Sequence, residues 1–168
     1  LADSLGVNFG SGRNNASLGT NDSAGVIPQT NWNNASGDTG TLSNLKDDSG
    51  ATKTTNITWN IDEQWSDGDT PANANGTLMK GWISANDNAS PGSIQISSIP
   101  FTTYDLYIYL NHDRASEDVL ITETRSAFPD FLAQENDPSI TGPITFTRQL
   151  ESAATNPAAS GTYVRFEG

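Results

Sequence analysis

Short segments in which apolar and polar residues alternate recur along the chain, and this alternation restricts the fold more than any other feature. Successive side chains of a strand point to opposite faces, so such segments are typical of strands with one buried face. Clusters of Gly, Asn, Asp, Ser and Pro separate the segments, as expected of turns. The alternating segments are 5–9, 24–29, 55–61, 78–83, 93–99, 104–110, 118–124, 144–150 and 162–167. They are too numerous for one flat sheet of ordinary size, so we predict an all-β fold, a two-layer antiparallel β-sandwich or jelly roll.

A single stretch has helical spacing. Phe128, Phe131 and Leu132 recur at intervals that place them on one face of a helix, and Pro129 occupies a position that a first turn tolerates. We therefore expect one short helix within residues 126–136, capping the sandwich.

Composition limits the number of domains and the classes of partner. The 168 residues suffice for one domain with a buried core, and the absence of Cys excludes disulfides and thiolate metal sites. The 20 acidic and 8 basic residues give a net charge of -12, which repels nucleic acid and anionic lipid surfaces. No apolar run reaches the ~20 residues that a membrane helix needs. We expect an N-terminal extended segment at 1–10 and a β-sandwich domain at 11–168, without nucleic-acid partners or membrane insertion.

Several motifs together resemble a β-sandwich domain of secreted and cell-surface proteins of environmental bacteria. They are "AGVIPQTNWNNASGDTGT" at 24–41, "GATKTTNITWNI" at 50–61, "LMKGWI" at 78–83, "IPFTTYDLYIYLNHD" at 99–113 and "GTYVRF" at 161–166. The resemblance implies a β-sandwich, export, and a setting in large surface or matrix proteins or near polysaccharide-degrading modules. Members of that family usually continue past the last motif into at least one more strand, whereas this chain ends at Gly168. The start at Leu1 is typical of a chain whose signal peptide was removed or of a fragment, and we expect an extracellular or cell-surface protein.

The sequence displays no recognisable catalytic constellation. The only histidine, His112, stands in a turn-forming stretch without the partners that a triad or a histidine-based metal site requires. Carboxylates that could act on glycosides cluster at Asp62, Glu63, Asp67 and Asp69, but their spacing singles out no acid and nucleophile. We therefore expect a non-catalytic protein, with a glycosidase or lyase as the third hypothesis.

Acidic loops offer oxygen ligands for a hard cation such as calcium. The candidate stretches are "LKDDSG" at 45–50, "WSDGDT" at 65–70 and "HDRASED" at 112–118, and none has the spacing of an EF-hand loop. Asp67 and Asp69 are the candidate ligands of one structural calcium ion. The alternative is that these residues form turns and provide solubility. No other cofactor is expected.

The four tryptophans fall into two classes. Trp59 and Trp82 lie in apolar strand patterns and are expected in the core. Trp32 and Trp65 lie in polar contexts, where an exposed ring beside amides and carboxylates suits sugar stacking. The alternative is that each of these two folds back to plug an end of the sandwich.

Triplets of the form Asn-x-Ser/Thr occur only slightly more often than composition predicts, and they are candidate glycan attachment sites. All but Asn56 are expected in loops, where a glycan can be accommodated. The candidates are Asn15, Asn21, Asn34, Asn56, Asn75 and Asn88.

The start of the chain places Leu5, Val7 and Phe9 on one face of an alternating segment. This segment is either an ordinary first strand of the sandwich or a strand donated to an open edge of the next molecule. A donated strand makes a head-to-tail contact that does not close, and therefore a filament.

Residues 104–110 alternate an aliphatic row with a row that contains Tyr107 and Tyr109. We expect the aliphatic row in the core, and the tyrosines against the protein's own loops, a sugar or another copy of the chain. The first hypothesis is a non-catalytic structural subunit of a glycosylated extracellular fibre or surface assembly, a homopolymer with contacts at the N-terminal row and the tyrosines. The alternative is a carbohydrate-binding module of a polysaccharide-degrading system.

Overall fold

The structure, a computed structural model, describes residues 3–10, 12, 14, 16–85, 91–111, 118–122, 131–135, 140–149 and 160–168. The chain divides into two compact units. Unit 1 comprises Leu1–Thr102 and Ile140–Pro143, and unit 2 comprises Thr103–Ser139 and Ile144–Gly168. The described residues form strands and one short helix, which confirms the predicted all-β class with a single helix.

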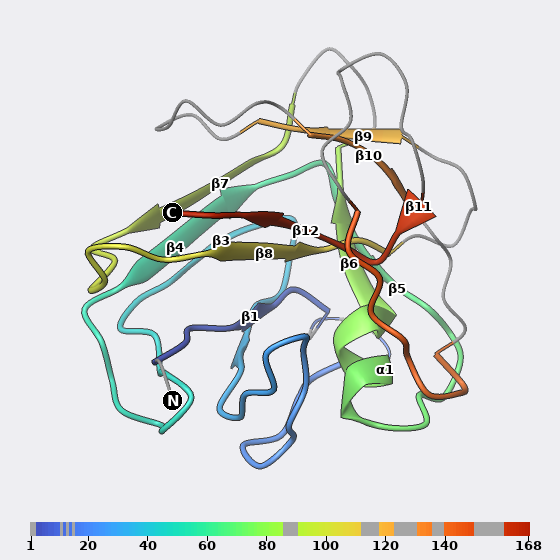
Figure 1. Cartoon of the computed structure of the whole chain (residues 1–168), viewed down its shortest axis with the longest axis horizontal. Helices are drawn as coiled ribbons and strands as arrows, with labels where there is room; N and C mark the ends of the chain where they lie inside the picture. The colour runs from blue at the N-terminus through green and yellow to red at the C-terminus, as the bar shows by residue number, and fades with distance from the viewer. Residues whose placement is uncertain are drawn as a thin grey trace. The chain divides into compact units, whose positions relative to one another are not determined.

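Unit 1 contains the helix and three small sheets (Figure 1). β1 and β2 pair in parallel, β5 and β6 pair antiparallel, and β4 is the central strand of an antiparallel sheet with the order β3-β4-β7. The elements are β1 (Val7–Asn8), β2 (Asn33–Asn34), β3 (Thr39–Leu42), β4 (Asn56–Asn60), β5 (Glu63–Ser66), α1 (Ala74–Lys80), β6 (Gly81–Ser84) and β7 (Ser93–Ser97).

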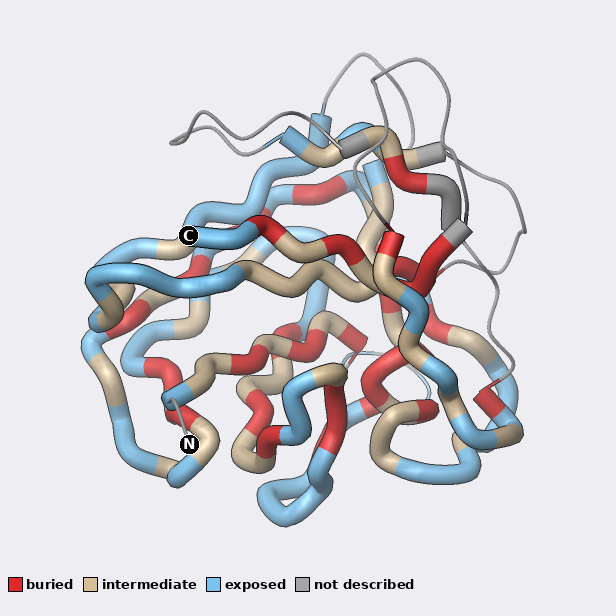
Figure 2. The backbone as a smooth tube through the Cα atoms, viewed as in Figure 1, coloured by how far each residue is buried: buried red, intermediate tan, exposed pale blue. Residues whose placement is uncertain are grey.

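One face of the β3-β4-β7 sheet carries the core of unit 1. Along β4, Ile57 and Trp59 are buried whereas Thr58 and Asn60 are exposed. Figure 2 colours the whole backbone by the burial of each residue. Partly buried side chains from β1, β6 and the neighbouring segments pack on the same cluster. The two-stranded pairs thus supply a second layer over the three-stranded sheet.

Unit 2 repeats the two-layer principle with different strands. β8 (Leu106–Tyr109) pairs antiparallel with β12 (Tyr163–Phe166), and the two strands run side by side in Figure 1. The second sheet has the order β11-β10-β9, formed by β9 (Asp118–Ile121), β10 (Phe131–Glu135) and β11 (Ser160–Gly161). Aliphatic residues of β8, β9 and β12 surround Ala133 in one cluster, so the expected inward aliphatic row of 104–110 is confirmed at Leu106, Ile108 and Leu110.

Among the described residues the helix lies elsewhere than predicted, and residues 126–130 and 136 of the predicted helix lie outside them. Residues 131–135, inside the predicted helix, form β10, because they pair with β9 over a full antiparallel ladder. The observed helix α1 begins after its N-cap Asn73, whose side chain accepts a hydrogen bond from the Gly76 N–H at 3.1 Å. It includes residues 78–80, so the predicted strand 78–83 is a helix end joined directly to β6.

Two other predicted strands are replaced by irregular structure. Residues 24–29 form a turn closed by reciprocal backbone hydrogen bonds of 3.1 Å between Ala24 and Gln29. In 144–149 the structure has only an isolated bridge between Arg148 and Tyr163. The division of the chain also differs from the expected boundary at residue 10, because β1 belongs to unit 1 and packs in its core.

Candidate functional site

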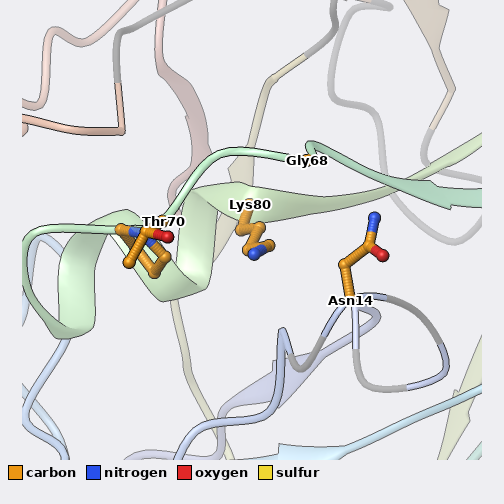
Figure 3. Close-up of a pocket in the computed structure, with 5 residues that line it drawn as sticks. Asn14, Gly68, Thr70 and Lys80 are labelled. Atoms are coloured by element: carbon orange, nitrogen blue, oxygen red, sulfur yellow. The ribbon is translucent and has the colours of Figure 1, made fainter.

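A pocket of about 380 Å³ opens in unit 1 beside the C-terminal end of α1. Figure 3 shows Lys80 between Thr70 on one side and Asn14 on the other. The lining residues come from three segments: the loop after β1, the turn after β5 and the last residue of α1. They are Asn14, Gly68, Thr70, Pro71 and Lys80.

The turn after β5 is held by the Asp67 side chain and by both neighbouring segments. The Asp67 carboxylate accepts the Asp69 N–H at 2.8 Å, which is the local turn bond typical of Asp. The Asp67 N–H donates to the Lys80 carbonyl at 2.9 Å, which ties the turn to α1. The Asn14 side chain donates to the carbonyls of Ser66 and Asp67, each at 3.4 Å. These bonds place the three segments around one concave surface.

Lys80 is the most unusual residue of this pocket. Its exposed fraction is only 5%, and its Nζ donates to the Asp69 carbonyl at 2.8 Å. Within the described ranges, the ion pairs involve other basic residues, and no carboxylate pairs with Lys80. A buried ammonium group is costly unless charge and hydrogen-bonding capacity are both satisfied. One backbone carbonyl occupies only one of its three donors.

Trp65 lies on β5, immediately before the turn that lines the pocket. Its neighbours Gln64 and Ser66 are buried, and Gln64 fixes the strand by accepting the Gly37 N–H at 2.8 Å and donating to the Ala35 carbonyl at 3.2 Å. Alternation therefore turns Trp65 outward, with an exposed fraction of 41%. This exposure agrees with the solvent-facing position expected of Trp65, whereas sugar stacking by the ring stays a prediction.

Trp32 is in the opposite situation. Its exposed fraction is 9%, and its Nε1 donates to the Gln29 carbonyl at 3.0 Å. Gly6 lies so close that a Cβ there would overlap the indole ring. The prediction of Trp32 as a stacking platform is therefore wrong, because the protein itself covers the ring. The core placement of Trp59 and Trp82 is confirmed, since both are buried.

In the described parts of the chain, acidic residues converge at the candidate stretch 45–50 and not at the named ligands Asp67 and Asp69. Asp3, Asp47 and Asp48 bring carboxylate oxygens within 4.8 Å of one another. Lys53 already supplies a cation there, because its Nζ lies 2.8 Å from Asp47 and 3.4 Å from Asp3. These contacts stabilise the charged form of the Asp47 carboxylate. The hydrogen bond from Lys53, which has the largest effect, and the one from Ser49 hold the pKa of Asp47 well below its usual range. Asp47 therefore serves as a structural ion-pair partner.

The predicted calcium ligands Asp67 and Asp69 lie beside the pocket. Asp67 binds its own turn, and the Asp69 carbonyl accepts from Lys80, so the cation that contacts this loop is an ammonium group. Calcium binding there stays a prediction. Of the other acidic candidates, Asp62 is exposed and Glu63 is half-buried at the start of β5. His112 lies outside the described residues.

The candidate glycan attachment sites are only partly in loops. Asn34 lies in β2, Asn75 in α1 and Asn56 in β4, which corrects the loop placement of the first two. The Asn34 amide donates to the Leu18 carbonyl at 2.8 Å, and a glycan on that nitrogen would compete with this bond. Asn21 is exposed, whereas Asn15 and Asn88 lie outside the described residues. Glycosylation itself stays a prediction.

The residues predicted as subunit contacts all have partners in their own unit. Leu5, Val7 and Phe9 pack on the core cluster of unit 1. In unit 2, Tyr107 and Tyr109 lie 6.0 and 6.5 Å from Tyr163 between ring centroids. Tyr109 is also 5.4 Å from Phe146, and Arg165 stands 5.6 Å over the Tyr107 ring. The tyrosine row thus contacts its own sheet and a neighbouring segment.

The sequence did not single out the pocket residues Asn14, Thr70 and Lys80. The one usable signal was the lone charge in "LMKGWI", since a lysine between apolar residues requires a special environment. No described helix is long and apolar enough to cross a membrane. No family model, curated protein or solved structure matches this chain.

Proposed function

We propose that this chain is a non-catalytic, extracellular carbohydrate-binding module whose glycan contact is the outer face of β5 and the turn that follows it. The observation that carries the proposal is an outward-facing tryptophan, Trp65, directly before a polar pocket. The extracellular location rests on the resemblance of the motifs to secreted β-sandwich domains.

The residue types at this surface match what sugars require. The CH face of a pyranose stacks on an aromatic ring, while its hydroxyl groups exchange hydrogen bonds with amides, hydroxyls and charged groups. Trp65 offers the ring, and Asn14, Thr70 and Lys80 offer polar groups at the pocket beside the same strand and turn. Because β5 is fixed by the buried Gln64, the ring is presented on a rigid element.

Electrophoresis through gels cast with soluble glycans tests the proposal. We expect the intact chain to be retarded by at least one glycan, and Trp65→Ala to abolish the retardation because the stacking surface is lost. The matched control is Ile94→Ala, since Ile94 is another exposed apolar residue of unit 1, 48% exposed, on β7. A panel of neutral and acidic glycans that leaves the mobility of the intact chain unchanged would refute the proposal.

The competing hypothesis of a head-to-tail fibre needs residues 1–10 to leave their own molecule. Their apolar row is engaged in the core of unit 1, and Phe9 contacts the Trp59 ring edge-on with 5.6 Å between centroids. Releasing the segment would expose this core. We therefore place glycan binding before self-assembly.

A further inference from the structure

We infer that the pocket beside Lys80 binds the oxyanion of an acidic sugar, so that unit 1 prefers glycans with carboxylate or sulfate groups. This inference rests on the proposed glycan-binding function and specifies its ligand class. In this inference the bound ligand is the counter-ion of the buried Lys80 ammonium group.

The burial of Lys80 is the first step of the argument. The C-terminal position on α1 favours a cation, and the aliphatic stem is covered by protein. The ammonium group, however, has the Asp69 carbonyl as its hydrogen-bond acceptor and no carboxylate partner in the described segments. Buried charges in proteins are normally paired, and an anion entering the pocket would provide the missing pair.

The shape of the pocket allows an anion to reach the ammonium group. In Figure 3 the Lys80 side chain extends from the end of α1 into the space between Thr70 and Asn14. Gly68 leaves the rim open, because a Cβ at this position would have no atom within 4 Å. The hydroxyl of Thr70 adds a hydrogen-bond donor at the wall, whereas the Asn14 amide N–H groups donate to the Ser66 and Asp67 carbonyls.

The acidic groups nearby do not cancel this preference. The Asp67 carboxylate is directed to the Asp69 N–H of its own turn, and the Asp69 side chain is exposed to solvent. The net charge of -12 repels anions at long range, but salt screens exposed charges beyond roughly 8 Å at physiological ionic strength. A direct, desolvated contact with Lys80 is screened much less.

Dissociation constants of the full chain for two matched pairs of polymers test the inference. The pairs are polygalacturonate with its carboxyl-reduced form, and dextran sulfate with dextran. We expect the intact chain to bind at least one acidic polymer roughly 10- to 100-fold more tightly than its neutral partner, the range of one charge-assisted hydrogen bond. Lys80→Met should lower the affinity for the acidic polymer more than the affinity for its neutral partner, and so remove this preference.

Lys46→Met is the control for net charge, because Lys46 is an exposed lysine of the same unit, and it should retain the preference. Gly68→Phe provides a second variant that keeps the cation but fills the open rim, and it should also lose the preference.

If Lys80→Met and Gly68→Phe both discriminate between acidic and neutral polymers as the intact chain does, the inference is refuted. Glycan binding that depends on Trp65 would then still preserve the proposed function. Lys80-dependent binding that Trp65→Ala leaves unchanged would support the pocket and refute the stacking platform. No binding to any of the four polymers would refute the inference. The proposed function would then be tested separately, by the retardation of the chain in gels cast with other glycans.

Discussion

Trp59 occupies the centre of the unit 1 core and depends on a glycine opposite to it. The indole Nε1 donates to the Gly37 carbonyl at 2.8 Å, and the ring lies edge-on to Phe9. On the facing strand β3, Gly40 is the register partner of Trp59, and a Cβ at Gly40 would overlap the ring. The glycine therefore makes room for the tryptophan across the sheet.

Gly40→Ala should lower the free energy of unfolding by about 1–3 kcal/mol, because the added methyl group overpacks the core. Denaturation with urea, followed by tryptophan fluorescence, measures the change. Gly68→Ala is the matched control and should have little effect on stability, since its Cβ would meet no atom within 4 Å. Equal stabilities of the two variants would contradict this account of the core.

Acid should weaken the protein at Asp47. The folded pKa of this carboxyl is lowered, so its stabilising contribution is present above the unfolded pKa of ~4 and is lost as the pH falls below it. The same hydrogen bond raises the pKa of Lys53, so its contribution to folding stability is fully present below the unfolded lysine pKa of ~10.4 and is lost only as the pH rises above that value. Melting temperatures between pH 6 and 3, chosen to cross the value of ~4, should fall less steeply for Asp47→Asn than for the intact chain. A control variant, Asp62→Asn at an exposed position, should keep the steep fall.

At the scale of elements, α1 shows how a local signal can be hidden by a stronger pattern. The alternation in 78–83 predicted a strand, yet the Asn73 cap and the following turn start a helix that ends at Lys80. Gly81 follows in the extended conformation that begins β6, and a Cβ at Gly81 would overlap the backbone of Gly10, so this close approach of the two segments requires glycine. The helix is short, so its stability depends on the cap and on packing.

Asn73→Ala should therefore destabilise the protein by ~1 kcal/mol, since the Gly76 N–H loses its acceptor. Asn73→Asp and Asn73→Ser retain an oxygen acceptor at the same position and should preserve most of the stability. Thermal unfolding followed by circular dichroism compares the three variants. An alanine variant as stable as the serine variant would show that the cap is dispensable.

At the scale of the whole molecule, the question is whether the N-terminal segment is a strand of its own core or a strand donated to another copy. β1 pairs with β2 in parallel, and its apolar row packs on the unit 1 core. An intramolecular strand and a strand exchanged between copies would make the same contacts, so self-assembly stays a prediction that concentration-dependent measurements must test.

Phe9→Ala should lower the free energy of unfolding by ~3 kcal/mol at every protein concentration, because a core strand acts within one molecule. Analytical ultracentrifugation together with urea denaturation checks both the oligomeric state and the stability. Leu120→Ala, at an exposed position on β9, is a control that should change little. Stability that rises with protein concentration, with polymers seen by electron microscopy and lost in Phe9→Ala, would instead favour the fibre hypothesis.

The class of the fold and the inward rows of β4, β8 and β12 follow from the sequence because they depend on alternation, which is a local property of the chain. Local sequence patterns identified only part of the candidate site. Trp65 stood out as a tryptophan in a polar context, but Trp32 had a similar context and is buried. The difference arises from segments distant in sequence, such as Gly6 against the Trp32 ring.

The sequence by itself determined an acidic, cysteine-free chain of short strands with one short helix, because charge, composition and period-2 alternation need no knowledge of distant contacts. Only the tertiary structure decided which strands pair, where the helix forms and which tryptophan faces solvent. It also decided that Lys80 meets Asn14 and the turn after β5 at one pocket. These outcomes depend on pairing and packing between segments far apart in the chain, which local patterns do not encode.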